Sequence, residues 1–211
     1  MIVFLVGASG ATGMCVLNQL LSRGYQVSAL VRTPENHKFP DDENLTIIKG
    51  DALQINSYLQ HLSHVDAVIS TLGTGISRKP TTIYSEGGRN IITAMRQAGI
   101  KKLIVLTAAA FDTSNPEADT FLVRSIVRPL FKYVYTDMKI LEQLLEESLD
   151  LDWTCIRPTR LTSQKGTHQY RINVNYNPKG GRKISRMDLA RFIVDQIESN
   201  QFVHKKPVIA Y

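Results

Sequence analysis

The first 23 residues hold the feature that most restricts the fold, a glycine-rich turn between an apolar run and an amphipathic segment. Residues 2–6 are continuously apolar, as in a strand that is buried on both faces of a parallel sheet. Gly7, Gly10 and Gly13 follow at once with the spacing GxxGxxG, and residues 13–23 place apolar side chains at helical intervals. A strand, a tight glycine turn and a helix in this order predict a phosphate-binding unit of the dinucleotide-binding type.

Strand-like and helix-like segments alternate along the rest of the chain. We expect further strands at 26–31, 45–49, 67–72, 102–106, 153–156 and 208–210, the last at an edge, and helices at 55–62, 85–98, 135–147 and 185–198. Ser185, with Asp188 three residues later, predicts a capped start for the last helix. Strands joined by helical crossovers predict a Rossmann-type α/β fold, with a doubly wound, mainly parallel sheet, helices on both faces and a small C-terminal substrate lobe.

The domain organisation follows from the length of the chain. Its 211 residues suit a single NAD(P)-binding Rossmann domain over 1–211. Two segments, 111–134 and 161–183, break the alternation and follow the ends of later strands. Open α/β sheets bind ligands at that edge, so we expect both segments to be lids on the substrate side.

Charge and hydropathy exclude some classes of partner. The net charge is +6, but the Lys and Arg residues are scattered rather than concentrated on one segment, so nucleic acid is not an expected partner. No apolar run reaches the roughly 18–20 residues that span a bilayer, and residues 2–6 lack the basic region of a signal peptide. We expect a cytoplasmic monomer or homodimer without membrane contact. The five His residues show no metal-binding spacing, so no metal site is expected.

The glycine turn supplies the first candidate cofactor contacts. They are Gly7, Ser9, Gly10, Ala11, Thr12 and Gly13, because the amides at a helix start bind phosphates. Arg32 lies about 19 residues beyond Gly13, where NAD-preferring folds carry an acidic residue. An Arg there accommodates a 2′-phosphate, which predicts NADP(H) rather than NAD(H), with Lys38 as a second cation. The alternative is that Arg32 is an ordinary solvated side chain.

Two later strand ends supply further candidates. Asp51, followed by Ala52, is placed to meet the adenine edge or to cap the next helix. Leu72, Gly73 and Thr74 follow the fourth strand, where glycine permits close approach of backbone to the cofactor.

These motifs, with residues 30–32, 80–98 and 157–158, carry a family resemblance over nearly the whole chain. The chain resembles the atypical short-chain dehydrogenases/reductases of the NmrA-like, NAD(P)H-binding family, and within it the flavin reductases, or biliverdin-IXβ reductases. The resemblance implies a Rossmann core that holds NADP(H), with the nicotinamide near Gly73, Thr107 and Pro158.

The resemblance also implies a catalytic pair. Tyr135 and Lys139 have the Tyr-x-x-x-Lys spacing, which places both on one helix face. Lys139 would hold the nicotinamide ribose and lower the pKa of Tyr135, a general acid for carbonyl reduction; alternatively, Tyr135 packs the first lid. Ala108 stands where catalytic members usually have Ser, so Thr107 would serve as hydrogen-bond donor. Thr159 stands where the flavin reductase has His.

The sequence is compatible with two functions. One is an NADP(H)-dependent oxidoreductase that transfers hydride to a small-molecule acceptor, namely a flavin, a quinone or a carbonyl compound. The other is a non-catalytic redox sensor of the NmrA type, which binds NAD(P)H and regulates a partner protein.

Overall fold

A mainly parallel sheet forms the centre of the protein. The computed structural model describes residues 1–115, 117 and 119–211. Within these residues eight strands form one sheet in the order β3-β2-β1-β4-β5-β6-β10-β8. Their bounds are β1 Ile2–Val6, β2 Gln26–Val31, β3 Leu45–Lys49, β4 Ala67–Ser70, β5 Lys102–Leu106, β6 Asp152–Pro158, β8 Arg171–Val174 and β10 Pro207–Ala210. The order 3-2-1-4-5-6 is that of the Rossmann fold, which confirms the predicted fold class.

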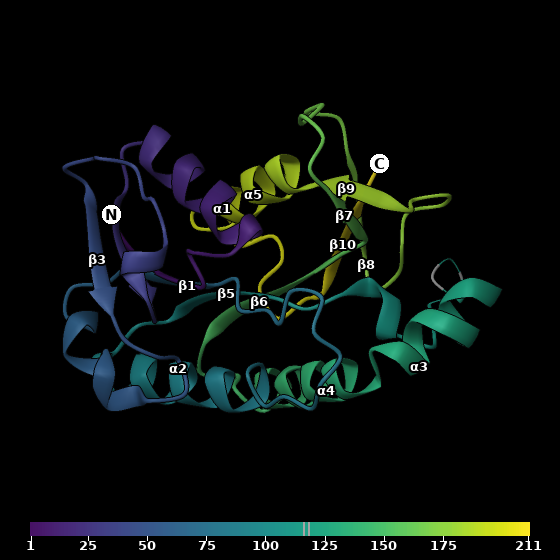
Figure 1. Cartoon of the computed structure of the whole chain (residues 1–211), viewed down its shortest axis with the longest axis horizontal. Helices are drawn as coiled ribbons and strands as arrows, with labels where there is room; N and C mark the ends of the chain where they lie inside the picture. Colours follow the sequence, from purple (N-terminus) through teal and green to yellow (C-terminus); the bar gives the residue numbers. More distant parts are fainter. Residues whose placement is uncertain (116, 118) are drawn as a thin grey trace.

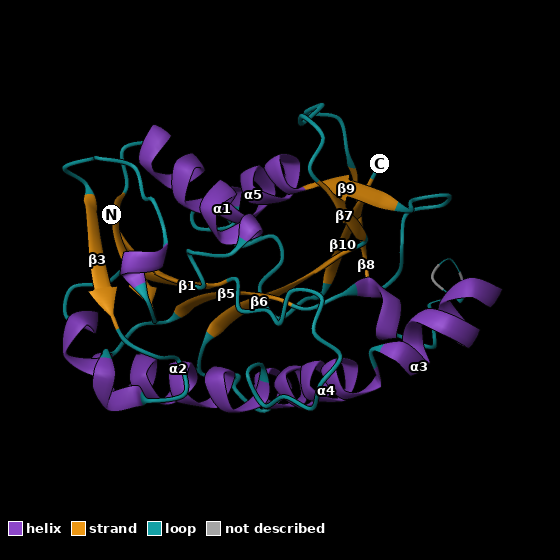
Figure 2. Cartoon of the chain, in the orientation of Figure 1, coloured by secondary structure: helices purple, strands orange, loops and turns teal. Residues whose placement is uncertain are grey.

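Helices cover both faces of this sheet (Figures 1 and 2). The helices are α1 (Ala11–Ser22) and α5 (Arg186–Asp195) on one face, and α2 (Ser85–Ala98) and α4 (Lys132–Glu146) on the other. Because strand side chains alternate between faces, Val3 and Leu5 enter the core under α1 and α5. Phe4 and Val6 enter the core over α2 and α4. The first apolar run is therefore buried on both sides.

Several predicted elements are found at their predicted places. The helix at 85–98 and the strand at 102–106 have the expected bounds, and Ser185 caps α5 by accepting the N–H of Asp188 at 3.0 Å. The helix expected at 55–62 is instead two short 3-10 turns, Ile55–Ser57 and Leu59–Leu62. A single short helix is only marginally stable by itself, so local packing decides its form.

The end of the chain differs from the prediction. The strand at 208–210 was expected at an edge, but β10 pairs in parallel with β6 and antiparallel with β8, which is the true edge. The partner strand β8 comes from inside the second predicted lid. The same segment overlaps β7 (Arg160–Thr162) and β9 (Lys183–Ser185), which pair as a separate two-stranded parallel sheet.

The first predicted lid is helical in much of its length. It contains the π-helical turn Val123–Val127, α3 (Arg128–Leu130) and the first residues of α4, after a 3-10 turn at Ala109–Phe111. Positions 116 and 118, which fall in this lid, lie outside the described residues. No helix among the described residues is long and apolar enough to cross a membrane.

Candidate functional site

A cleft of about 600 Å³ lies at the carboxyl ends of the central strands. The sheet order changes direction between β1 and β4, the position at which doubly wound sheets bind ligands. Most of the predicted cofactor residues line this cleft, namely Gly7, Ser9, Gly10, Ala11, Thr12, Arg32, Asp51, Ala52, Leu72, Gly73, Thr107 and Pro158. Gly13, Thr74 and Lys139 are not among the lining residues.

The three glycines of the turn have three different surroundings. Gly7 has φ +84°, and a Cβ there would lie 2.9 Å from the Thr71 carbonyl. At Gly13 a Cβ would lie 2.0 Å from the Gly7 oxygen. At Gly10 the nearest atom to an added Cβ is that same oxygen, at 3.4 Å. Gly7 therefore makes the turn, Gly13 allows the helix to pack on the strand, and Gly10 leaves the approach to a ligand open.

The start of α1 is suited to phosphate. Gly10 caps the helix without a side-chain hydrogen bond, and the first turn carries no acidic residue. The first amides of a helix lack internal partners and carry a partial positive charge. The hydroxyl of Thr71 fixes the turn by donating to the carbonyls of Val6 (3.0 Å) and Gly7 (3.2 Å). Sequence reasoning missed Thr71, which carries no motif.

Arg32 stands at one end of the cleft, directly after β2. Its side chain is exposed, and in the described part of the chain it has no carboxylate partner. The nearest acid in sequence, Glu35, pairs with Lys49 at 3.7 Å. His37, and not the predicted Lys38, also lines this end.

Asp51 stabilises a turn and does not cap a helix. Its carboxylate accepts the N–H of Leu53 at 3.0 Å in the turn that follows β3, whereas the short 3-10 helix Ile55–Ser57 begins after Gln54 without a side-chain cap. The same residue lines the cleft, and its contact with adenine remains a prediction.

The opposite end of the cleft is formed by Leu106, Thr107, Met138 and Pro158. Thr107 is buried, and its hydroxyl donates to the carboxylate of Glu142 at 2.8 Å. The proton of this hydroxyl is therefore directed into the protein interior. The role of Thr107 as a donor toward a substrate remains a prediction that this geometry does not support.

Glu142 is the centre of a buried ionic cluster behind Thr107. Its carboxylate accepts Arg157 Nε at 2.9 Å and pairs with Arg157 Nη2, while Lys206 Nζ lies at 3.2 Å. Arg157 also pairs with Asp112 at 2.7 Å. Burial by itself raises the pKa of Glu142, but Arg157, Lys206 and Thr107 outweigh it and hold this pKa below its usual value. Glu142 is therefore a carboxylate at neutral pH.

Neither Tyr135 nor Lys139 is among the residues that line the cleft. The Tyr135 ring packs against Phe111 and Phe131, at centroid distances of 6.0 Å. Lys139 is exposed and lines a separate hollow with Glu142 and other residues. The expected lowering of the Tyr135 pKa by Lys139 is wrong, because burial raises this pKa and only Arg128 opposes the rise. Met138, between the two, is the α4 side chain that meets the cleft.

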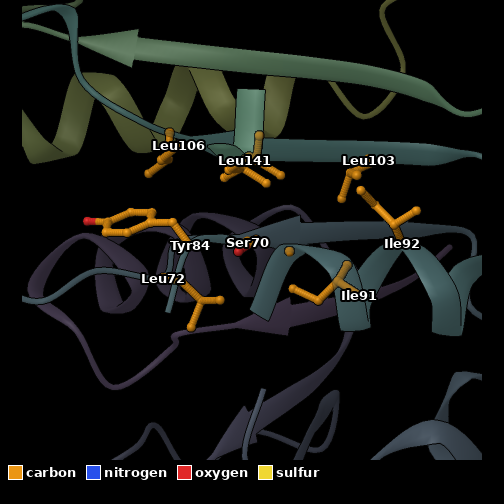
Figure 3. A pocket seen from close by; sticks show the side chains of 10 residues that line it. Ser70, Leu72, Tyr84, Ile91, Ile92, Leu103, Leu106 and Leu141 are labelled. Carbon is orange, nitrogen blue, oxygen red and sulfur yellow. The ribbon is translucent and has the colours of Figure 1, made fainter. Parts of the chain in front are cut away.

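Tyr84 is a cleft residue that sequence reasoning missed. It is buried, and it lines both the main cleft and a small apolar cavity, which Figure 3 shows. The Tyr84 hydroxyl points away from the leucine and isoleucine side chains of that cavity, and it lies 3.5 Å from a Cβ built on Gly73. Burial raises its pKa to about 12, against opposing contacts with Thr74. The predicted cofactor residue Thr74 thus contacts Tyr84.

Asp137 of α4 binds the start of α2 next to Tyr84. Its buried carboxylate accepts the backbone N–H groups of Tyr84 (2.8 Å) and Ser85 (3.2 Å), which begin α2. An acceptor from α4 therefore satisfies the first amides of α2. Among the described residues, no three His, Cys, Asp or Glu side chains gather as a metal site.

The fold and this cleft define a Rossmann-type dinucleotide-binding protein. The family described as NAD(P)H-binding matches residues 7–200, and the chain belongs to it.

Several known proteins are similar to this chain over all or part of its length. The uncharacterized protein YwnB of Bacillus subtilis is 26% identical over 201 residues, 92% of this chain and 91% of that protein. The photosystem II assembly factor Ycf39 of Synechocystis is 32% identical over 114 residues, 52% of this chain and only 35% of that protein. A wide-type short-chain dehydrogenase/reductase of Veillonella parvula, solved in complex with NADP, superposes with a TM-score of 0.81 over 100% of this chain and 94% of that one. Its identity is 18%, so it shows the fold alone.

Proposed function

We propose that the protein is an NADP(H)-dependent oxidoreductase that transfers hydride to a small acceptor, and that flavins and quinones suit it better than carbonyl compounds. The observation that carries the proposal is the single cleft that joins three features. These are the open approach at Gly10, the exposed cation Arg32 at one end and the apolar floor at Met138 and Pro158 at the other. Its volume of about 600 Å³ lies in the range of cofactor and small-molecule sites, roughly 300–1,000 Å³.

The choice of NADP(H) over NAD(H) rests on Arg32. An acidic residue after the second strand would hydrogen-bond the ribose 2′-hydroxyl, and none is present here. The guanidinium is exposed and has no carboxylate partner among the residues that the structure describes, so a 2′-phosphate can bind it without breaking an ion pair seen there. The Veillonella relative of the same fold binds NADP.

The choice of acceptor class rests on the small number of suitable proton donors at the Thr107 and Met138 end of the cleft. The bound cofactor would supply the hydride, while the protein supplies position and electrostatics. Thr107 donates to Glu142, and neither Tyr135 nor Lys139 lines the cleft. Tyr84 lines the cleft with a protonated hydroxyl, but its pKa of about 12 makes it a weak acid at neutral pH. A flavin or quinone needs little acid assistance, because it can take its proton from solvent after the hydride has arrived.

The same observation favours a second function. A cleft that binds NADPH without a directed proton donor also suits a redox sensor of the NmrA type, which reports the bound cofactor to a partner protein. The relationship to an assembly factor supports that alternative, although this chain spans only 35% of its length.

Turnover separates the two functions. NADPH oxidation by the purified protein is measured against FMN, a quinone and a simple aldehyde, with NADPH and NADH affinities titrated in parallel. The reductase predicts turnover with FMN or the quinone above that with the aldehyde, and tighter binding of NADPH than of NADH. Tight NADPH binding without turnover would establish the sensor, and failure to bind either nucleotide would refute both.

A further inference from the structure

Arg186 lines the cleft, although it lies in the C-terminal part of the chain. It is the first residue of α5, directly after the capping residue Ser185. The Ser185 cap fixes the backbone from which the Arg186 side chain projects. No motif in the sequence marks this residue as a ligand contact.

The guanidinium of Arg186 has no carboxylate partner in the described part of the chain. Its one hydrogen bond goes from Nη1 to the hydroxyl of Ser163, at 3.0 Å. Arg157, by contrast, is paired with both Asp112 and Glu142. Arg186 and Arg32 together outnumber the one acidic residue of the cleft wall, Asp51, so the cleft presents a net positive charge.

The neighbourhood of Cys15 shows which part of the cleft Arg186 reaches. Burial raises the pKa of the Cys15 thiol, and the positive charge of Arg186 opposes that rise. Cys15 is in the first turns of α1, which packs beside α5 (Figure 1). The charge of Arg186 therefore lies near the start of α1, where the first amides of the helix face the cleft. Arg32, the other cation of the cleft, follows β2 instead.

We propose that Arg186 binds the diphosphate of the dinucleotide, together with the free amides at the start of α1. A guanidinium donates two parallel hydrogen bonds to a phosphate, and no existing ion pair has to break. Arg32 and Arg186 then serve different phosphates: Arg32 selects the 2′-phosphate, and Arg186 holds the diphosphate common to NADP(H) and NAD(H). This inference rests on the proposed cofactor site.

The experiment uses three probes with the full-length protein. ADP carries a diphosphate without a 2′-phosphate, 2′-AMP carries the 2′-phosphate without a diphosphate, and NADPH carries both. Dissociation constants are measured for wild type, Arg186→Gln, Arg186→Lys and the matched control Arg182→Gln. Arg182 is exposed, lies in the same segment and is not among the residues that line the cleft.

We expect Arg186→Gln to weaken ADP and NADPH by about ten-fold or more, since it removes a charge-assisted contact. Binding of 2′-AMP stays within about two-fold, Arg186→Lys is intermediate, and Arg182→Gln matches wild type. Thermal unfolding of each variant checks that it is folded.

Unchanged ADP and NADPH binding in Arg186→Gln would overturn the inference while leaving the cofactor site intact. A raised KM for an anionic acceptor such as FMN in the same variant would then assign the guanidinium to the acceptor. If wild type binds none of the three probes, the proposed function itself fails.

Discussion

The hydroxyl of Thr107 donates a hydrogen bond of 2.8 Å to the buried carboxylate of Glu142. This contact joins the inner end of the cleft to the ionic cluster of Arg157 and Lys206. Thr107, which was expected to be catalytic, therefore stabilises the buried carboxylate behind the cleft.

Thr107→Val tests this assignment. The substitution removes one hydrogen bond from Glu142, so we expect the free energy of unfolding to fall by about 1–2 kcal/mol. Quinone reduction should stay within about three-fold of wild type, because the hydroxyl proton is not directed at the acceptor. Urea denaturation and steady-state rates are the measurements. A rate loss of a hundred-fold with unchanged stability would restore Thr107 as a proton donor.

Glu142→Gln should make the protein less stable in a pH-dependent way. The substitution leaves Arg157 and Lys206 undercompensated in a buried place, so we expect a loss of about 3 kcal/mol at pH 7. The folded-state pKa of Glu142 is lowered, so its stabilisation is present above the ordinary value of 4.5 and is lost as the pH falls through the folded-state pKa. Denaturation should show that the difference in free energy of unfolding between Glu142→Gln and wild type is smaller at pH 3 than at pH 7. The exposed Glu147→Gln is the control, and a difference independent of pH would contradict the ionic assignment.

Two alanine substitutions in the glycine turn should affect different properties, one the stability of the fold and the other the binding of NADPH. Gly13→Ala drives a Cβ to 2.0 Å from the Gly7 oxygen, so we expect destabilisation of about 3 kcal/mol or a failure to fold. Gly10→Ala places its Cβ 3.4 Å from that oxygen, so the fold should survive while NADPH binding falls by about ten-fold or more, because the methyl group obstructs the diphosphate. Thermal unfolding and NADPH titration measure both effects. Equal NADPH affinity in Gly10→Ala and wild type would place the cofactor elsewhere.

Arg32→Ala should change cofactor preference rather than overall binding. Loss of a charge-assisted contact to the 2′-phosphate predicts NADPH binding weaker by about 10- to 100-fold, with NADH affinity nearly unchanged. Lys38→Ala is the matched control, since that exposed cation does not line the cleft. An unchanged ratio of NADPH to NADH affinities in Arg32→Ala would show that Arg32 is only a solvated side chain.

Local patterns in the sequence were enough for the core of the fold. The apolar run at 2–6, the spacing of Gly7, Gly10 and Gly13, and the cap at Ser185 each depend on near neighbours, and the structure has all of them. Whether a strand lies at an edge depends on distant pairing. The strand at 208–210 was therefore misplaced, because β8 forms outside it.

Most residues that line the cleft near the glycine turn could be predicted from the sequence, and fewer of those at its other end could be. A spacing of four puts Tyr135 and Lys139 on one face of α4, but the rotation of that helix decides which face meets the cleft, and Met138 faces it. Tyr84 and Arg186 reach the cleft through tertiary packing of α2 and α5, for which no short motif exists.

The most direct test of the account is an equilibrium titration of the wild-type protein with NADPH and with NADH. We expect one site per chain, and NADPH binding at least about ten-fold tighter than NADH binding because Arg32 contacts the 2′-phosphate. Absence of binding by both nucleotides, or tighter binding of NADH, would contradict it.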